Sequence, residues 1–128
     1  METTITPLLT VSDAAAAVGY YKRAFGAIEV ERHDAGNGRL VVELQVDDEP
    51  FAVVDENPEA FNNSPQALRG TSVRLALFVD DPDAVFARAI EAGGKELFPM
   101  ADQPYGLRQG RVEDPFGHHW LVSKPLGD

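Results

Sequence analysis

The sequence contains one supersecondary pattern twice, and this repetition restricts the possible folds more than any other feature. Residues 5–27 and 73–95 align without a gap, so that Val11 falls on Val79 and Gly26 on Gly94. Each copy combines an apolar strand pattern, an acidic helix start, an alanine-rich helix and a terminal glycine. Because a repeated unit of this kind cannot bury its apolar face alone, the two copies must share one core. A paired arrangement of this kind also tends to leave a concave seam, where ligands bind.

Turn and capping signals divide each copy into the same elements. In the first copy we expect a strand over 5–11, a helix over 13–25, hairpin strands over 28–34 and 39–46, and a strand over 51–54. In the second copy we expect a strand over 73–79, a helix from Asp81 to Gly93, a strand over 95–98, a loop over 99–106, and strands over 108–113 and 117–124. The prediction is an α+β fold of two paired βαβββ modules. Residues 1–128 form one domain, with module one at about 1–56, a linker over 57–70 and module two over 71–128.

Composition excludes several classes of partner and chemistry. Eleven basic and 21 acidic residues give a net charge of −10, which disfavours nucleic acid and an anionic membrane surface. The chain has no cysteine, so disulfides and thiolate chemistry are excluded. The first ten residues lack the pattern of a signal peptide, and we expect a cytoplasmic protein. The negative charge serves solubility in the first place and would also attract a cationic small molecule.

Side-chain alternation separates the repeated first strands into two faces. One face is aliphatic and is expected to pack under a helix: Leu9, Val11, Val73, Leu75, Leu77 and Val79. The other face is mixed: Thr6, Leu8, Thr10, Arg74, Ala76 and Phe78. An unpaired buried arginine costs several kcal/mol, so Arg74 lies either beside a carboxylate or in a wet cavity. We favour the cavity, where Arg74 would bind an anion or a carbonyl group.

Three segments together resemble the vicinal-oxygen-chelate superfamily, which includes glyoxalases, bleomycin-resistance proteins and extradiol dioxygenases. These segments are YYKRAFGA, DPDAVFARAIEAGG and, above all, RVEDPFGHHW. The resemblance covers nearly the whole chain and is greatest to small bacterial glyoxalase-like members. It implies that the two modules form a cupped mixed sheet and that the protein is a homodimer.

The resemblance also implies where a divalent metal would bind in an enzyme of this superfamily. Its four ligand positions fall on Thr6 or Leu8, on Arg74 or Ala76, on Leu121, and between Phe51 and Glu56, where Asp55 or Glu56 could serve. At least three of the four expected ligands are therefore missing, whereas a catalytic metal needs about three protein ligands. We expect no metal and no other cofactor, with a divalent metal as the alternative.

The remaining candidates come from the last strand and from the loop before it. His118 and His119 point to opposite faces and cannot comfortably chelate one ion, so we expect His119 to line the cavity with Leu121 while His118 secures the turn. Trp120 is expected in the core. Tyr105 lies in a segment that resembles a lid over the cavity; it either stacks on a ligand or packs as an ordinary loop residue.

These observations predict a metal-free protein that binds a small molecule, of the bleomycin-resistance kind, with a cavity completed by a homodimer. Sequestration of an antibiotic is one such function. The expected ligand-binding residues are Thr6, Leu8, Arg74, Phe78, Tyr105, Arg108, His119 and Leu121, and we assign no catalytic residue. The alternatives are a metal-dependent lyase, isomerase or dioxygenase of the same superfamily, and an interaction module without a ligand.

Overall fold

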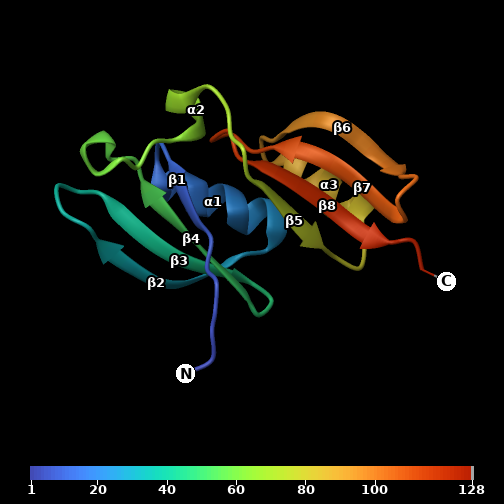
Figure 1. Ribbon diagram of the computed structural model, residues 1–128, viewed down its shortest axis with the longest axis horizontal. Helices are drawn as coiled ribbons and strands as arrows, with labels where there is room; N and C mark the ends of the chain where they lie inside the picture. The colour runs from blue at the N-terminus through green and yellow to red at the C-terminus, as the bar shows by residue number, and fades with distance from the viewer. Residues whose placement is uncertain (128) are drawn as a thin grey trace.

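The computed structural model describes residues 1–127, which form two four-stranded mixed sheets with one long helix packed on each (Figure 1). The first module contains β1 (Leu8–Val11), α1 (Ala14–Phe25), β2 (Ile28–Asp34), β3 (Leu40–Val46) and β4 (Glu49–Asp55). The strand order is β1-β4-β3-β2. β1 pairs with β4 in parallel, and the other pairs are antiparallel.

The second module repeats this topology. It contains β5 (Arg74–Phe78), α3 (Pro82–Glu91), β6 (Lys95–Asp102), β7 (Leu107–Glu113) and β8 (His119–Pro125), in the order β5-β8-β7-β6. The prediction of an α+β fold with two βαβββ modules is therefore confirmed. Two short helices, η1 (Pro58–Ala60) and α2 (Pro65–Leu68), lie in the segment expected to be a linker. The loop expected over 99–106 is shorter than predicted, because β6 continues to Asp102.

The caps of both long helices follow from the sequence. The Asp13 carboxylate accepts a hydrogen bond from the Ala16 amide at 3.1 Å, and the Asp81 carboxylate accepts one from the Ala84 amide at 3.2 Å. Gly26 ends α1 in the left-handed conformation, with φ of 70°. Gly94, its counterpart in the repeat, has a different role: a Cβ atom there would lie 2.7 Å from the Tyr20 hydroxyl oxygen. The second copy has a glycine at position 94 because neighbouring atoms already fill the space that a Cβ atom would need.

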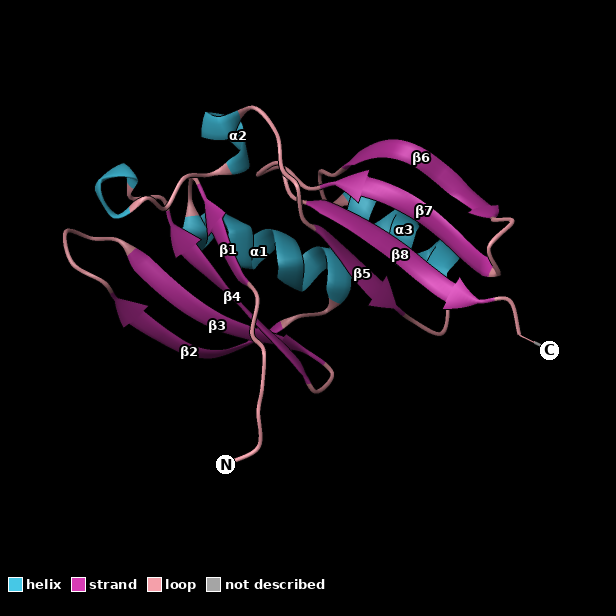
Figure 2. Ribbon diagram, viewed as in Figure 1, coloured by secondary structure: helices cyan, strands magenta, loops and turns pink. Residues whose placement is uncertain are grey.

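One hydrophobic core serves both modules. α1 and α3 pack against each other, and both lie behind the sheets on the same side (Figure 2). Aromatic rings cross the boundary between the modules: the centroid of the Trp120 ring lies 4.7 Å from that of Phe25 and 5.7 Å from that of Phe51. Trp120 is buried, as predicted. In the part of the chain that the structure describes, no helix is long and apolar enough to cross a membrane.

The opposite face of each sheet, which we call the outer face, carries neither α1 nor α3, the two helices that pack on the sheets in the described part of the chain (Figure 2). Along β5 the side chains alternate between exposed and half-buried, with Arg74, Ala76 and Phe78 exposed. Leu75 and Leu77 pack against the core on the helix side. Val73, expected on that side too, precedes β5 and is exposed. The mixed face of the repeated strands is therefore the outer face, where a ligand has access.

Candidate functional site

The strand register groups the outer-face side chains of the second sheet into rows. The rows are Arg74, His119, Glu113 and Lys95; then Ala76, Leu121, Arg111 and Phe98; then Phe78, Ser123, Gln109 and Ala101. Directly opposed residues on neighbouring strands share a face. Arg74, His119 and Leu121 therefore occupy one surface, as the alternation in the sequence predicted.

A hollow of about 290 Å³ lies on this surface, and we call it the arginine hollow. Its lining consists of Arg74, Phe98, Gln103, Tyr105, Gln109, Gly110, Arg111 and Leu121. Three of the predicted ligand-binding residues, Arg74, Tyr105 and Leu121, thus lie together. Phe98 and Arg111 were missed by the sequence reasoning, although the alternation of β7 relative to β8 is a signal that could have identified Arg111.

A chain of hydrogen bonds holds Tyr105 in the wall of the arginine hollow. Tyr105 lies in the turn between β6 and β7, and its hydroxyl donates to the Gln109 side-chain oxygen at 2.6 Å. The Gln109 amide group in turn donates to the Ser123 hydroxyl at 2.8 Å, and Gln109 and Ser123 are both buried. The Tyr105 residue nevertheless remains 58% exposed, so it offers a fixed aromatic surface to solvent.

Within residues 1–127, the two arginines of the hollow have no carboxylate partner in a salt bridge. The Arg111 guanidinium lies over the Phe98 ring, 5.9 Å from its centroid. Among residues 1–127, the arginines in salt bridges are Arg32 and Arg108. Glu113 is the nearest acid in the rows, and its carboxylate lies 3.9 Å from the His119 imidazole. The hollow is therefore a locally cationic site on an acidic protein.

The other predicted residues are distributed over separate hollows. Phe78 is 55% exposed and lines a mainly apolar cavity of about 430 Å³ between the modules, with Phe51 and Trp120. Leu8 lines a hollow beside α2, and His119 lines another beside α2. Thr6 precedes β1 and is exposed. One chain therefore does not gather these residues into a single pocket.

The structure places the Arg108 side chain against α3. Its guanidinium Nε lies 2.7 Å from Asp83 Oδ1, and the guanidinium also contacts Asp102 at 3.0 Å. Hydrogen bonding to Arg108 lowers the pKa of the Asp83 carboxyl, and the same contact raises the pKa of Arg108. Arg108 fastens a hairpin to a helix and does not line the arginine hollow.

Apolar side chains occupy several of the positions that the resemblance assigns to metal ligands. On β1 and β4 the outer-face pair is Leu8 opposite Ala52, and on β5 and β8 it is Ala76 opposite Leu121. Asp55 is not available as a ligand there, because its two carboxylate oxygens accept hydrogen bonds from the Ala14 and Leu40 amides. Leu8, Ala52, Ala76 and Leu121 offer only methyl and methylene groups, whereas a metal needs nitrogen or oxygen donors.

The RVEDPFGHHW motif has a structural role. The buried Asp114 carboxylate accepts hydrogen bonds from the Tyr21 hydroxyl, the Trp120 indole and the amides of Phe116 and His118. The His118 amide takes part in the turn through Asp114, while the side chain reaches β1 of the first module, where its Nε2 lies 2.8 Å from the Thr10 carbonyl oxygen. Burial, and then the Asp114 charge, raise the pKa of Tyr21 well above its ordinary value.

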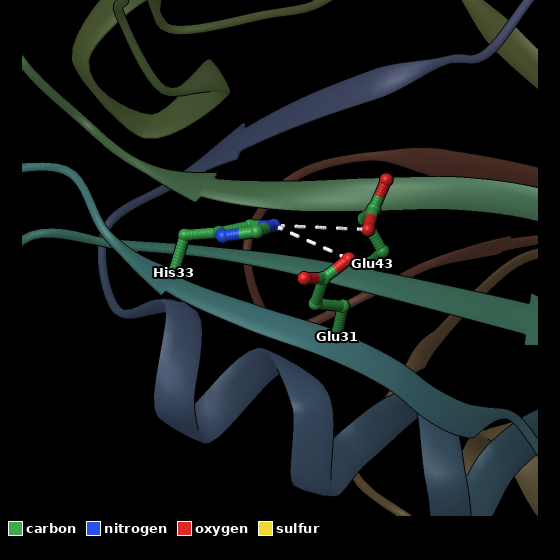
Figure 3. A group of neighbouring side chains, drawn as sticks. All are labelled: Glu31, His33 and Glu43. Atoms are coloured by element: carbon green, nitrogen blue, oxygen red, sulfur yellow. Dashed lines mark ion pairs between the residues drawn. The ribbon is translucent and has the colours of Figure 1, made fainter.

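One cluster of metal-ligating side chains does lie on the outer face of the first sheet (Figure 3). Glu31 and Glu43 are directly opposite in the β2–β3 ladder, and His33 Nε2 lies 3.7 and 3.8 Å from their carboxylates. The three ligand atoms lie within 4.8 Å of one another. All three side chains are at least half exposed, so the cluster is open to water.

Comparison with known proteins shows which family this sequence and fold resemble. The sequence profile of the Glyoxalase/Bleomycin resistance protein/Dioxygenase superfamily matches residues 4–122. The uncharacterized protein Rv0887c of Mycobacterium tuberculosis (strain H37Rv) is 37% identical over 130 residues, covering 98% of this chain and 76% of the relative.

Two solved structures have a similar fold. TioX from Micromonospora sp. ML1 has a TM-score of 0.76 and 26% identity, covering 98% of this chain and all of its own. The fosfomycin resistance protein FosX from Listeria monocytogenes, solved with Mn(II) and sulfate, has a TM-score of 0.73, 13% identity, and coverage of 97% and 93%. The match along nearly the whole sequence, together with the paired modules, means that this chain belongs to the glyoxalase/bleomycin resistance protein/dioxygenase superfamily.

Proposed function

We propose that this protein binds a small organic molecule without a metal, in a pocket formed by the arginine hollow and completed by a second copy of the chain. The observation that supports it most is that the outer face carries apolar side chains at expected metal-ligand positions. Leu8, Ala76 and Leu121 occupy positions where enzymes of the superfamily would bind a cation. Arg74 and Tyr105 lie together with Leu121 in the arginine hollow. Binding without chemistry needs only complementarity of shape and charge.

The uncovered outer faces support the homodimer. Leu8 is 63% exposed on the first sheet, and Phe78 and Phe98 are more than half exposed on the second. Exposed apolar side chains gathered on one face are typical of an interaction surface. The faces also differ in charge, since the first carries Glu31 and Glu43 while the second carries the two arginines of the hollow. If the first sheet of one copy lay over the second sheet of the other, the exposed apolar side chains would be covered and the opposite charges would face each other.

The class of ligand is a natural product such as an antibiotic, in the manner of bleomycin-resistance proteins. A thermal-shift screen of natural-product antibiotics, with and without chelator, tests this. A ligand held at about 100 times its Kd adds about 2.7 kcal/mol to the stability of the folded state. We expect a ligand that stabilises the protein equally in both conditions. Turnover of a compound that chelators abolish would overturn the proposal.

The second candidate function is a metal-dependent lyase, isomerase or dioxygenase. The cluster of Glu31, His33 and Glu43 is the observation that favours it, because it offers three ligand atoms outside the usual positions. Elemental analysis of native protein separates the candidates. A stoichiometric transition metal, lost together with activity in the His33→Ala variant, would favour the enzyme.

A further inference from the structure

We infer that the ligand of the arginine hollow is a planar aromatic anion. This inference rests on the proposed function, because it names the chemical class that the same hollow would bind. The class is an aromatic ring system that carries a carboxylate or a comparable acidic group.

The charge of the hollow is the first argument. The protein has a net charge of −10, yet Arg74 and Arg111 both line this one hollow. The other arginines with contacts are satisfied within the chain: Arg32 by Glu29, Arg88 by the Arg23 carbonyl oxygen, and Arg108 by Asp83. Within residues 1–127, neither arginine of the hollow enters a salt bridge, so their charges are free to attract an anion.

The cost of covering these arginines is the second argument. A ligand or a second copy that closes over the outer face removes water from both guanidinium groups. An uncompensated charge in such a place is strongly unfavourable, so the covering molecule must supply a hydrogen-bond acceptor, and a charged one compensates best. A cationic or purely apolar ligand would be excluded from this half of the pocket.

The aromatic walls are the third argument. Phe98 and Tyr105 line the hollow and are 59% and 58% exposed, which is high for large aromatic side chains in a fixed position. The Tyr105 hydroxyl is held by Gln109, and the Phe98 ring lies under Arg111. A contact with the face of a guanidinium leaves its N–H edge free for an anion. A planar ring with an acidic substituent could thus stack on an aromatic wall while its acidic group forms an ion pair with a guanidinium group.

A rival explanation uses the same residues. Glu31 and Glu43 on the first sheet of a second copy would neutralise the two arginines, and the hollow would then be an interface without an anionic ligand. The two explanations differ in what Arg74 controls: the affinity for an anion, or the stability of the dimer.

Calorimetric titration with three probes of the same ring decides between them: naphthoate, naphthamide and naphthyltrimethylammonium. We expect naphthoate to bind at least about tenfold more tightly than neutral naphthamide, and the cation to bind least. The Arg74→Gln and Arg111→Gln variants should abolish the preference for naphthoate while retaining naphthamide binding. Arg23→Gln, on α1 behind the sheets, is the control with the same loss of charge and should retain the preference.

Results that overturn the inference of an anionic aromatic ligand can be told apart from results that overturn small-molecule binding itself. Equal affinity for naphthoate and naphthamide overturns the inference and leaves binding intact. A preference that survives in Arg74→Gln, with a weakened dimer by size-exclusion chromatography, also overturns it in favour of the rival. Binding by no probe overturns it as well, and the antibiotic screen then decides the proposed function separately.

Discussion

The hydroxyl of Tyr21 donates a hydrogen bond to the carboxylate of Asp114, and this contact joins α1 of the first module to the β7–β8 turn of the second. The same carboxylate accepts a hydrogen bond from the Trp120 indole at 2.9 Å. Both rings belong to the shared core, where their centroids lie 5.5 Å apart. Asp114 is therefore the polar centre of the junction between the two modules.

Removing this carboxylate should weaken the whole fold. Asp114→Ala is expected to lower the free energy of unfolding by about 3–5 kcal/mol, because buried donors on Tyr21 and Trp120 and in the backbone of the turn lose their acceptor. Urea unfolding followed by circular dichroism measures it. Asp48→Ala, at an exposed turn position, should change stability by no more than about 0.5 kcal/mol. A loss below about 1 kcal/mol in the Asp114 variant would mean that water replaces the carboxylate.

Alkaline pH should unfold the protein through Tyr20 and Tyr21. Burial raises the pKa of both hydroxyls above the ordinary value of 10.0, whereas in the unfolded chain they titrate near that value. The stabilisation is therefore complete below pH 10 and is lost as the pH rises further, since the unfolded state then binds fewer protons. Tyrosinate absorbance and circular dichroism, recorded together, should show these two side chains ionising only as the fold is lost. Their ionisation in a folded protein would contradict the burial.

The two glycines of the repeat should respond differently to substitution. Gly94→Ala is expected to cost about 1–3 kcal/mol through overpacking, because the new Cβ would contact Tyr20, Val112 and the Ala89 carbonyl. Gly26→Ala should cost about 1 kcal/mol through backbone strain alone, since its surroundings are open. Asparagine separates the two causes: it tolerates the left-handed conformation at position 26 but is larger still at position 94. Equal effects of asparagine at both positions would refute this distinction.

The opposed carboxylates of the first sheet should be slightly destabilising. Glu31 and Glu43 face each other across the β2–β3 ladder, and like charges at such positions repel. Glu43→Gln is therefore expected to raise the free energy of unfolding by about 0.5 kcal/mol, as measured by urea unfolding. Glu59→Gln, an exposed change in η1 with the same loss of charge, is the control and should have a smaller effect. A destabilised Glu43 variant would point to a bound cation at this cluster.

Arg108 should be dispensable for ligand binding. Its guanidinium is held by Asp83 and Asp102, outside the arginine hollow. Arg108→Gln is expected to change the affinity for naphthoate by less than about twofold, because separated sites act independently. A loss of naphthoate affinity as large as that of Arg74→Gln would mean that Arg108 belongs to the binding site.

The fold was largely predictable from local signals. Asp13, Asp81 and Gly26 mark helix ends by side-chain chemistry and backbone freedom that need no tertiary context. The β6 strand was cut short in the prediction because Pro99 suggested a loop. β6 is an edge strand, however, and an edge position tolerates a residue without an N–H donor.

The site was less predictable because it depends on register. Alternation within β5 and within β8 correctly placed Arg74 and Leu121 on a common face. Arg108 was expected to bind the ligand, whereas Arg111 of the same strand lines the hollow; a shift of one residue along β7 exchanges the two faces. Phe98 was missed because irregularities in the β6–β7 pairing, on both sides of it, decide which way it points. Such irregularities arise from packing that the sequence does not display.

Every strand that lines the arginine hollow carries two independent sets of side chains, one turned toward the helices and one toward solvent. Mutations at exposed members of the second set, such as Arg74, would change the surface offered to a ligand without disturbing the core. A chain built this way can acquire a new specificity by successive exchanges along β5, β7 and β8, each tolerated because the buried half of the strand stays as it was.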